Sequence, residues 1–568
     1  MTTTRRFFTL FLCGISLLSA QQKLSPELEK ATGSQTTRVL VCRTPNNNGL
    51  SVAARLMPKT RQVFPKTGIT VADLTPAEIK SLALDAGVDY IAPDRAVTAS
   101  LDYAAQATFA DLAANSNWTG AGVGVAILDS GAEIGHHDLT NRILTTTNLV
   151  PGQFGVVDGY GHGTHVAGIL AGTGKMSTGV QYKATFRGIA PQAELHIFRV
   201  LDATGAGRDS YVIDAIERIL LYNELEKLKS KPRPIRIINL SLGRPVFESF
   251  TSDPLAQAAE KAWRAGIVVV AAAGNYGRLN NLGNNGYATI TSPGNHPFVI
   301  TVGAMNTLKT ATRADDVMAT YSSKGPSYGD HVIKPDIVAP GNLIAAAIAK
   351  NSFLYSNYPA NRVLDSDYKV NGAAKASGDY FRLSGTSMAT PVVSAAAALL
   401  LQKSPALTPD QVKATLMLTA GKSFPTSSAI TDSSTGQTFH IQYDIFTVGA
   451  GYLHIADALA FGGQLPSGRA ASPFAQLNPQ TGAVTLITSN SAIWGESALW
   501  GSSALWGSSA VWGTSVLNGA SALWGSSAVW GTSGTQGFSA LWGSSALWGS
   551  SALWGNSALW GSSINGDK

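Results

Sequence analysis

Residues 235–275 have the sequence IRIINLSLGRPVFESFTSDPLAQAAEKAWRAGIVVVAAAGN. The stretch begins and ends with apolar runs, IRIINLSLG and IVVVAAAGN, which lack polar alternation and are typical of strands buried on both faces. Between them, PLAQAAEKAWRAG predicts a helix. Parallel strands need a crossover connection of this kind, so the stretch predicts a parallel sheet covered by helices.

The same alternation of apolar strands and helices extends over residues 101–465. Further strands are predicted at VGVAILD (123–129), AELHIFRVL (193–201) and FVITVGA (298–304), and further helices at 210–228, 387–402 and 408–420. We therefore expect an α/β domain with helices on both faces of its sheet. Right-handed crossovers bring the carboxyl ends of the parallel strands to one edge, where the ligand sites of such sheets lie.

A smaller α+β unit is predicted at residues 21–100. Its strands are RVLVCRT (38–44), ITVADL (69–74) and VDYIAPDRAV (88–97), and its helices are expected at 49–57 and 75–87. Thr75 and Glu78 form a capping-box pattern, and Pro76 occupies the first helical position, where a missing N–H costs nothing.

The first twenty residues have the pattern of a signal peptide, with Arg5 and Arg6 ahead of an apolar run and small residues at its end. An uncleaved anchor is disfavoured because the run is shorter than the roughly 20 residues that span a bilayer. We therefore expect a secreted protein. Cys13 lies in this segment and leaves Cys42 without an intrachain partner, so no disulfide is expected. The net charge of +6 is scattered and does not indicate nucleic-acid binding.

The composition changes beyond residue 465. Residues 466–490 are rich in Gly, Ser, Pro and Ala and are interpreted as a linker, and the hexapeptide SALWGS then repeats over residues 491–563. Because six is a multiple of two, a strand would place every Trp on one face, which favours a β-prone repeat. A disordered low-complexity tail is the alternative that the sequence leaves open.

Three polar motifs stand at the ends of predicted elements. Asp129 ends the run VGVAILD, His162 begins an apolar helix in GHGTHVAGILAG, and Ser387 precedes the helix MATPVVSAAAALLLQ. A carboxylate can fix the tautomer of an imidazole, the imidazole can act as a general base, and a helix N-terminus favours a developing oxyanion. Taken singly, the motifs have other interpretations: a turn aspartate, a capping serine, or a zinc ligand in the HxxH pair of His162 and His165. Zinc is disfavoured because the HExxH pattern of zinc proteases is absent.

Taken together, the motifs VAILDSG, GHGTHVAGILAG and LSGTSMATP match the three signatures of the subtilase family of serine proteases. The chain resembles this family closely over residues 100–465 and loosely over 21–100. The resemblance implies a subtilisin-like fold and an acyl-enzyme mechanism with Asp129, His162 and Ser387 as the catalytic residues. It also implies that Asn275 supplies an oxyanion-hole donor, and that residues 21–100 are an inhibitory propeptide that the enzyme removes by cutting between 97 and 106.

The resemblance also implies a substrate pocket. Its walls correspond to Ser241, Leu242, Gly243, Ala272, Ala273 and Gly274, and its floor lies near Thr291. No acidic residue occupies these positions, so we expect broad specificity with cleavage after apolar residues. Asp138 matches a calcium position of many subtilases, but the usual partner loop is replaced by GTGKMSTGVQYKATFRG, so calcium is left open and no metal or other cofactor is predicted.

Two other functions compete with a protease. A surface protein could use the domain as a scaffold and bind glycan or the cell envelope through its Trp repeats. The filled positions of the triad argue against this. An esterase would usually carry a GxSxG elbow, whereas this chain has GTSMA at Ser387. The sequence therefore favours a self-processing, secreted serine endopeptidase acting on polypeptides.

Overall fold

The computed structural model of the protein describes residues 23–24, 26–29, 31–43, 56–64, 69–93, 104–279, 285–432, 436–463, 465, 468–477, 484–487 and 566–567. The chain separates into two compact units, residues 1–98 and 99–568. The predicted signal peptide, most of the helix expected at 49–57 and the SALWGS repeats lie outside the described residues. Across the described parts of the chain, the structure contains no helix with the length and hydropathy of a membrane span.

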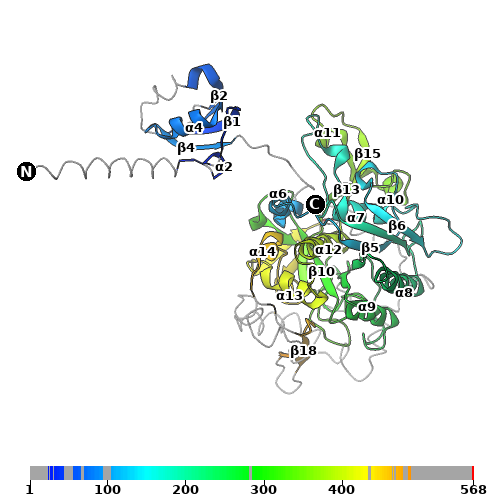
Figure 1. Ribbon diagram of the computed structural model, residues 1–568. Coiled ribbons are helices and arrows are strands. Elements are labelled where there is room, and N and C mark those ends of the chain that lie inside the picture. The colour runs from blue at the N-terminus through cyan, green and yellow to red at the C-terminus, as the bar shows by residue number, and fades with distance from the viewer. Residues whose placement is uncertain are drawn as a thin grey trace, which may run out of the picture. The chain divides into compact units, whose positions relative to one another are not determined.

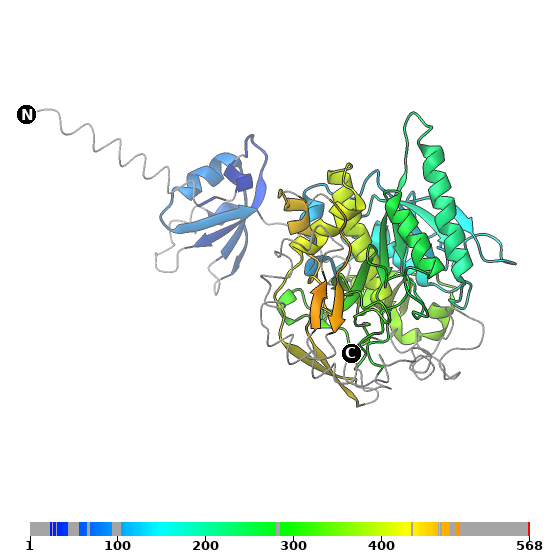
Figure 2. The same cartoon turned by 90° about the horizontal axis from the view of Figure 1, so that it is seen from below.

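The first unit is a four-stranded antiparallel sheet with one face covered by a helix (Figures 1 and 2). The strand order is β2 (Thr60–Phe64), β3 (Ile69–Leu74), β1 (Thr37–Arg43) and β4 (Val88–Pro93), with helices α2 (Pro26–Glu29) and α4 (Pro76–Ala83). β3 and β4 are both antiparallel to β1 and α4 joins them, which makes a split βαβ unit. The predicted capping box is present: Thr75 N donates to Glu78 Oε2 at 2.9 Å, and Glu78 N donates to Thr75 Oγ1.

The second unit is built on an eight-stranded sheet that is parallel except at β11. Its order is β11 (Val317–Met318), β10 (Ile300–Asn306), β9 (Val268–Ala272), β8 (Ile235–Leu240), β5 (Gly124–Asp129), β7 (Glu194–Arg199) and β6 (Ile143–Asn148), with β12 (Ile337–Pro340) also paired to β10. All five predicted strands are present as β5, β7, β8, β9 and β10, which confirms the parallel α/β class. The other three strands were not predicted: β6 is an edge strand with alternating exposure, and β11 and β12 have only two and four residues.

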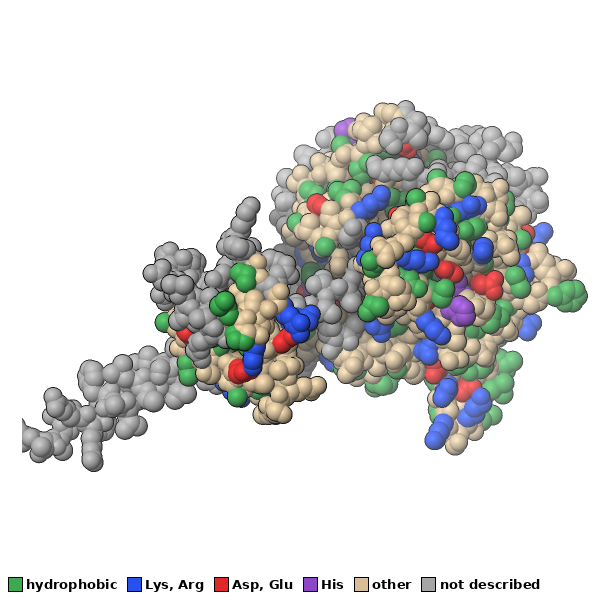
Figure 3. Space-filling model, turned by 90° about the horizontal axis from the view of Figure 1, so that it is seen from above, with side chains coloured by type: hydrophobic (Ala, Val, Ile, Leu, Met, Phe, Trp, Pro, Cys, Tyr) green, Lys and Arg blue, Asp and Glu red, His purple; other side chains and the backbone are tan. Residues whose placement is uncertain are grey.

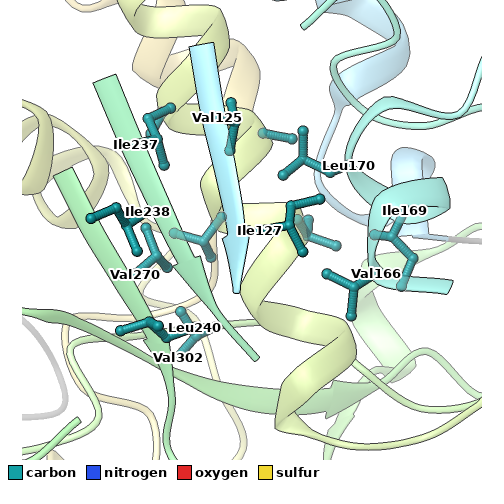
Figure 4. Close-up of a cluster of buried hydrophobic side chains, with 14 of the residues drawn as sticks. Val125, Ile127, Val166, Ile169, Leu170, Ile237, Ile238, Leu240, Val270 and Val302 are labelled. Atoms are coloured by element: carbon teal, nitrogen blue, oxygen red, sulfur yellow. The ribbon is translucent and has the colours of Figure 1, made fainter. Parts of the chain in front are cut away.

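Helices cover both faces of this sheet (Figure 2). α8 (Asp209–Glu226) and α9 (Pro254–Arg264) pack together on one face, and α7 (His162–Ala171) and α12 (Thr386–Lys403) pack together on the other, with α13 (Pro409–Thr419) and α14 (Ile455–Ala460) beside α12. Every residue of α7 is buried, as are all residues of α12 up to Leu401. In Figure 4, Val125 and Ile127 of β5 lie against Val166 and Leu170 of α7. This double burial explains why the strands lack polar alternation.

Smaller elements complete the second unit. A three-stranded antiparallel sheet, in the order β13 (Ile344–Ala347), β15 (Ala376–Leu383) and β14 (Arg362–Leu364), packs against α7. Further elements are α5 (Ala104–Ala107), α6 (Ala110–Asn115), α10 (Phe353–Asn357), α11 (Asp365–Tyr368) and the hairpin of β16 (Ser427–Thr431) and β17 (Thr438–Gln442). Among the residues drawn in colour in Figure 3, basic side chains lie interspersed with acidic ones rather than in one basic patch.

The interpretation of residues 466–490 as a linker is wrong over the described part of that segment. β18 (Phe474–Leu477) and β19 (Val484–Ile487) form a hairpin, and Ala475 N donates to the carbonyl of His331. Just before it, Ser472 is fully buried and its hydroxyl donates to Asp336 at 2.5 Å. Composition could not predict the burial of Ser472, because serine is common in linkers. Its burial is explained by its partner Asp336, which is distant in the sequence.

Candidate active site

Asp129 and His162 form a buried pair at the carboxyl edge of the sheet. Asp129 is the last residue of β5, and His162 is the first residue of α7. His162 Nδ1 lies 2.8 Å from Asp129 Oδ1, and Ser130 N donates to the same oxygen at 2.7 Å. Both side chains are almost completely buried. The carboxylate therefore orients the ring with its Nδ1 protonated, so that Nε2 is the basic nitrogen.

Asp158, which the sequence analysis did not single out, organises the loop ahead of His162. Its Oδ1 accepts from Ser130 Oγ and Gly161 N, both at 2.7 Å, and its Oδ2 accepts from the backbone and hydroxyl of Thr164. These bonds connect the turn after Asp129 to the first turn of α7. The signal available in the sequence was an aspartate four residues before His162, which by itself has no distinctive pattern.

The surroundings raise the pKa of His162. Burial alone would lower it, but the negative charge of Asp129, the hydrogen bond between the two side chains and the charge of Asp158 outweigh that effect. The two carboxylates therefore stabilise the imidazolium relative to the neutral ring. A histidine that accepts a proton during a reaction benefits from such stabilisation, since its cationic form is transient.

Ser387 lies in the first turn of α12, on the helix that packs directly against α7 (Figure 1). Its backbone carbonyl accepts from Ser241 Oγ at 2.8 Å, and Ser241 in turn accepts from Asn239 Nδ2 at 2.9 Å. These contacts fix the turn to the carboxyl end of β8. Within the described part of the chain, Ser387 Oγ is buried and makes no hydrogen bond to another residue, so this hydroxyl is not committed to a structural role.

Asn275 is held in one orientation just after β9. Its Oδ1 accepts from Thr386 N at 2.9 Å and from Thr386 Oγ1 at 3.1 Å, and that hydroxyl accepts from Gly274 N. The amide nitrogen Nδ2 lies on the side of Gly385, 3.2 Å from the position that a Cβ would take there. The bonds to Thr386 thus turn the donor end of the amide toward the start of α12, where Ser387 lies.

The predicted pocket segments meet at Thr291. A Cβ on Gly243 would lie 2.4 Å from Thr291 Oγ1, and one on Gly274 would lie 2.7 Å from its Cγ2. Thr291 N donates to the carbonyl of Ala273 at 3.0 Å. The two glycines therefore allow the segments Ser241–Gly243 and Ala272–Gly274 to approach one buried threonine. Arg244, the next residue after the first segment, is buried in ion pairs with Asp209 and Asp253.

His165 has a structural role that does not involve His162. Its Nε2 lies 3.0 Å from the carbonyl oxygens of Ile344 and Phe381, so this nitrogen carries a proton and donates to the antiparallel sheet. Burial lowers the pKa of His165 to about 3, which keeps the ring neutral. Nε2 is therefore not available to a metal ion, and the described residues place no cluster of three or more His, Cys, Asp or Glu side chains around His165, which argues against the HxxH alternative.

The surroundings of Asp138 do not fit a calcium ion. Asp138 Oδ1 accepts from Met176 N at 2.8 Å, and Oδ2 accepts from the hydroxyl of Tyr380 at 2.6 Å. Both oxygens are thus engaged by hydrogen-bond donors, whereas calcium would need further oxygen ligands. Among the described residues, no cluster of three or more His, Cys, Asp or Glu side chains could hold a metal ion. The expectation that no cofactor is needed stays a prediction.

A parallel α/β sheet with an Asp–His pair after one strand and a serine in the first turn of the central helix defines a subtilisin-like serine endopeptidase. The chain belongs to the subtilase family, whose model matches residues 120–445. It is 36% identical over 379 residues to the serine protease AprX of Bacillus subtilis. The aligned region covers 65% of this chain and 78% of that protein.

Two further relatives have similar coverage. Subtilisin E of Bacillus subtilis is 32% identical over 373 residues, or 64% of this chain and 80% of that protein. Subtilisin DY of Bacillus licheniformis is 34% identical over 311 residues, or 55% of this chain and 88% of that protein. The enzyme class expected from the three sequence motifs is therefore confirmed, and the chain is a serine endopeptidase that hydrolyses peptide bonds.

Proposed function

We propose that this protein is a secreted, self-processing endopeptidase in which Asp129, His162 and Ser387 are the catalytic residues. The observation that carries the proposal is the 2.8 Å bond between His162 Nδ1 and Asp129 Oδ1, with Ser387 on the helix packed against that of His162. Secretion is supported by residues 1–20, and a zymogen by the separate compact unit of residues 1–98.

In the proposed mechanism, His162 Nε2 takes the proton of Ser387 Oγ as this oxygen attacks the substrate carbonyl. Asp129 keeps Nδ1 protonated and stabilises the imidazolium. Asn275 Nδ2 donates to the developing oxyanion, and His162 then gives its proton to the leaving amine. Water releases the acyl group from Ser387 by the same steps, with His162 again acting as the base.

The test of this proposal is labelling with a serine-directed fluorophosphonate, followed by peptide mass spectrometry. We expect one covalent adduct, on Ser387, because only a serine with an adjacent base is nucleophilic enough to react. His162→Ala should lose the adduct while remaining folded. An adduct on another serine, or labelling that persists without His162, would contradict the assignment.

The substrate preference is a second part of the proposal. The segments proposed as pocket walls hold only uncharged residues, and Arg244, which follows Gly243 in sequence, is already paired with two carboxylates. Apolar side chains before the cut therefore suit this pocket better than charged ones. Contact between the Trp repeats and a cell surface or glycan rests on the sequence alone and stays a prediction.

Asn275→Ala is expected to lower kcat about 10²–10³-fold, with a small effect on KM. Removal of the corresponding donor from subtilisin has an effect of this size, because the donor binds the transition state more strongly than the substrate. Steady-state kinetics on a peptide anilide would measure it. Asn285→Ala, which removes a surface asparagine, is the matched control. A loss confined to KM would show that Asn275 only binds substrate.

Asp158→Asn is expected to move the acid limb of the pH profile of kcat/KM to lower pH. Only neutral His162 can act as the base, so activity falls as pH drops through the pKa of His162, which lies above the ordinary histidine value of 6.5. Burial lowers this pKa, whereas the charges of Asp129 and Asp158 raise it, so removing one of these charges lowers it. The limb should stay in place in Asp214→Asn, a change on the exposed face of α8. An unmoved limb in Asp158→Asn would show that His162 does not respond to that charge.

A further inference from the structure

Gly566 and Asp567 occupy a defined site on the second unit, although the SALWGS repeats separate them in sequence from its other described residues. Asp567 is buried, with 4% of its surface exposed. Its partners Arg278, Thr320 and Asn342 follow β9, β11 and β12, respectively. None of these residues takes part in the proposed catalytic mechanism.

The side chain of Asp567 is recognised as a carboxylate. Its Oδ1 accepts from Arg278 Nη2 at 2.7 Å, and its Oδ2 accepts from Thr320 N at 2.8 Å. Arg278 is fixed in turn by bonds from Nε to Thr320 Oγ1 and from Nη1 to Asp432. A buried carboxylate needs this combination of a paired cation and backbone donors. An apolar side chain would leave the guanidinium without one of its partners, and a neutral amide would replace the ion pair by a weaker uncharged hydrogen bond.

The backbone around Asp567 is recognised as well. The side-chain amide of Asn342 accepts from Asp567 N and donates to the carbonyl of Asp567, both at 2.9 Å. Gly566 has a φ of 65°, and a Cβ on it would lie 2.3 Å from both Asn342 Oδ1 and Ser384 Oγ. Any side chain at that position would therefore collide with the site. The site selects glycine followed by aspartate.

We propose that these residues form an intramolecular binding site for a Gly-Asp segment, which Gly566–Asp567 fills. The hairpin of β18 and β19, which precedes the SALWGS repeats in sequence, and Gly566–Asp567, which follow them, belong to the same compact unit. Two residues of the Gly-Asp site are close in sequence to proposed catalytic residues. Arg278 follows Asn275 by three residues, and Ser384 precedes Ser387 by three. This site does not depend on the proposed roles of the catalytic residues.

The test uses the full chain in a Ser387→Ala background, which prevents self-digestion, and measures the thermal unfolding midpoint. We expect Asp567→Ala to lower Tm by about 3 °C or more, since it removes an ion pair and leaves Arg278 short of a partner. Asp457→Ala removes an exposed carboxylate of the same unit and should change Tm less. Arg278→Met and Asp567→Ala should not be additive when combined.

The Asp567→Ala protein also reports on sequence selection. Added at millimolar concentration, the peptide SINGDK (residues 563–568) should displace the altered segment from the site and raise Tm, whereas SINADK, with alanine at the glycine position, should not. An unchanged Tm in Asp567→Ala, additive effects in the double variant, or an equal response to both peptides would each overturn the proposal.

Discussion

Ser387→Ala is expected to lower casein hydrolysis about 10⁶-fold, the size of effect seen when the serine of subtilisin is removed. The hydroxyl lies in the first turn of α12, while the Asp129–His162 pair remains intact without it. Removing one atom thus abolishes the nucleophile and leaves the base with no proton to accept. The chain should remain folded, because Ser387 Oγ makes no hydrogen bond to another described residue.

The same variant tests self-processing. In a protease-free host, the N-terminus of Ser387→Ala should retain residues 21–100, whereas the unmutated protein should begin between 97 and 106. Intact-mass spectrometry distinguishes the two. Ser394→Ala, which removes another buried serine of α12 that donates to Asn239, is the matched control and should still be processed. Complete processing of Ser387→Ala would show that another protease makes the cut.

Asp336→Ala is expected to lower the free energy of unfolding by about 3–5 kcal/mol. Asp336 is buried at the start of β12, with Lys334 Nζ 2.7 Å from Oδ2 and Lys413 Nζ 3.1 Å from Oδ1. Both lysines are fully buried, so the substitution leaves two ammonium groups without a counter-charge. It also removes the acceptor of Ser472 Oγ and of Thr301 N. A loss of this size is a large share of the stability of a typical protein.

Chemical denaturation of Asp336→Ala in the Ser387→Ala background measures this loss without self-digestion. Asp214→Ala breaks an exposed i,i+4 ion pair with Arg218 on α8 and is the matched control, with a much smaller expected effect. A change in Asp336→Ala no larger than that of the control would mean that water or a rearranged partner solvates the lysines.

Local patterns in the sequence were sufficient to predict most of the fold of the second unit. The sequences of β5, β8 and β9 are apolar on both faces. Such a run predicts a buried strand whichever helix covers each face. The capping box at Thr75 was predictable for the same reason, since both partners lie within one turn. Asp129 and Ser387 could be singled out because each stands at the end of such an element.

Other features arise from partners distant in sequence. The role of Asp158 depends on Ser130 Oγ and Thr164 Oγ1, and the buried Ser472 is explained only by Asp336. The strands β13 and β15 pair with about thirty residues between them, and their sequences do not specify that register.

The sequence by itself determined the parallel α/β class, the identity of the motif residues and the enzyme family, because periodicity and short motifs are properties of neighbouring residues. Only the tertiary structure decided which polar side chains are buried together, such as Asp336 with Lys334 and Lys413, or Asp567 with Arg278. A buried charge is stable only beside a specific partner, and the partner is selected by folding of the whole chain rather than by its place in the sequence.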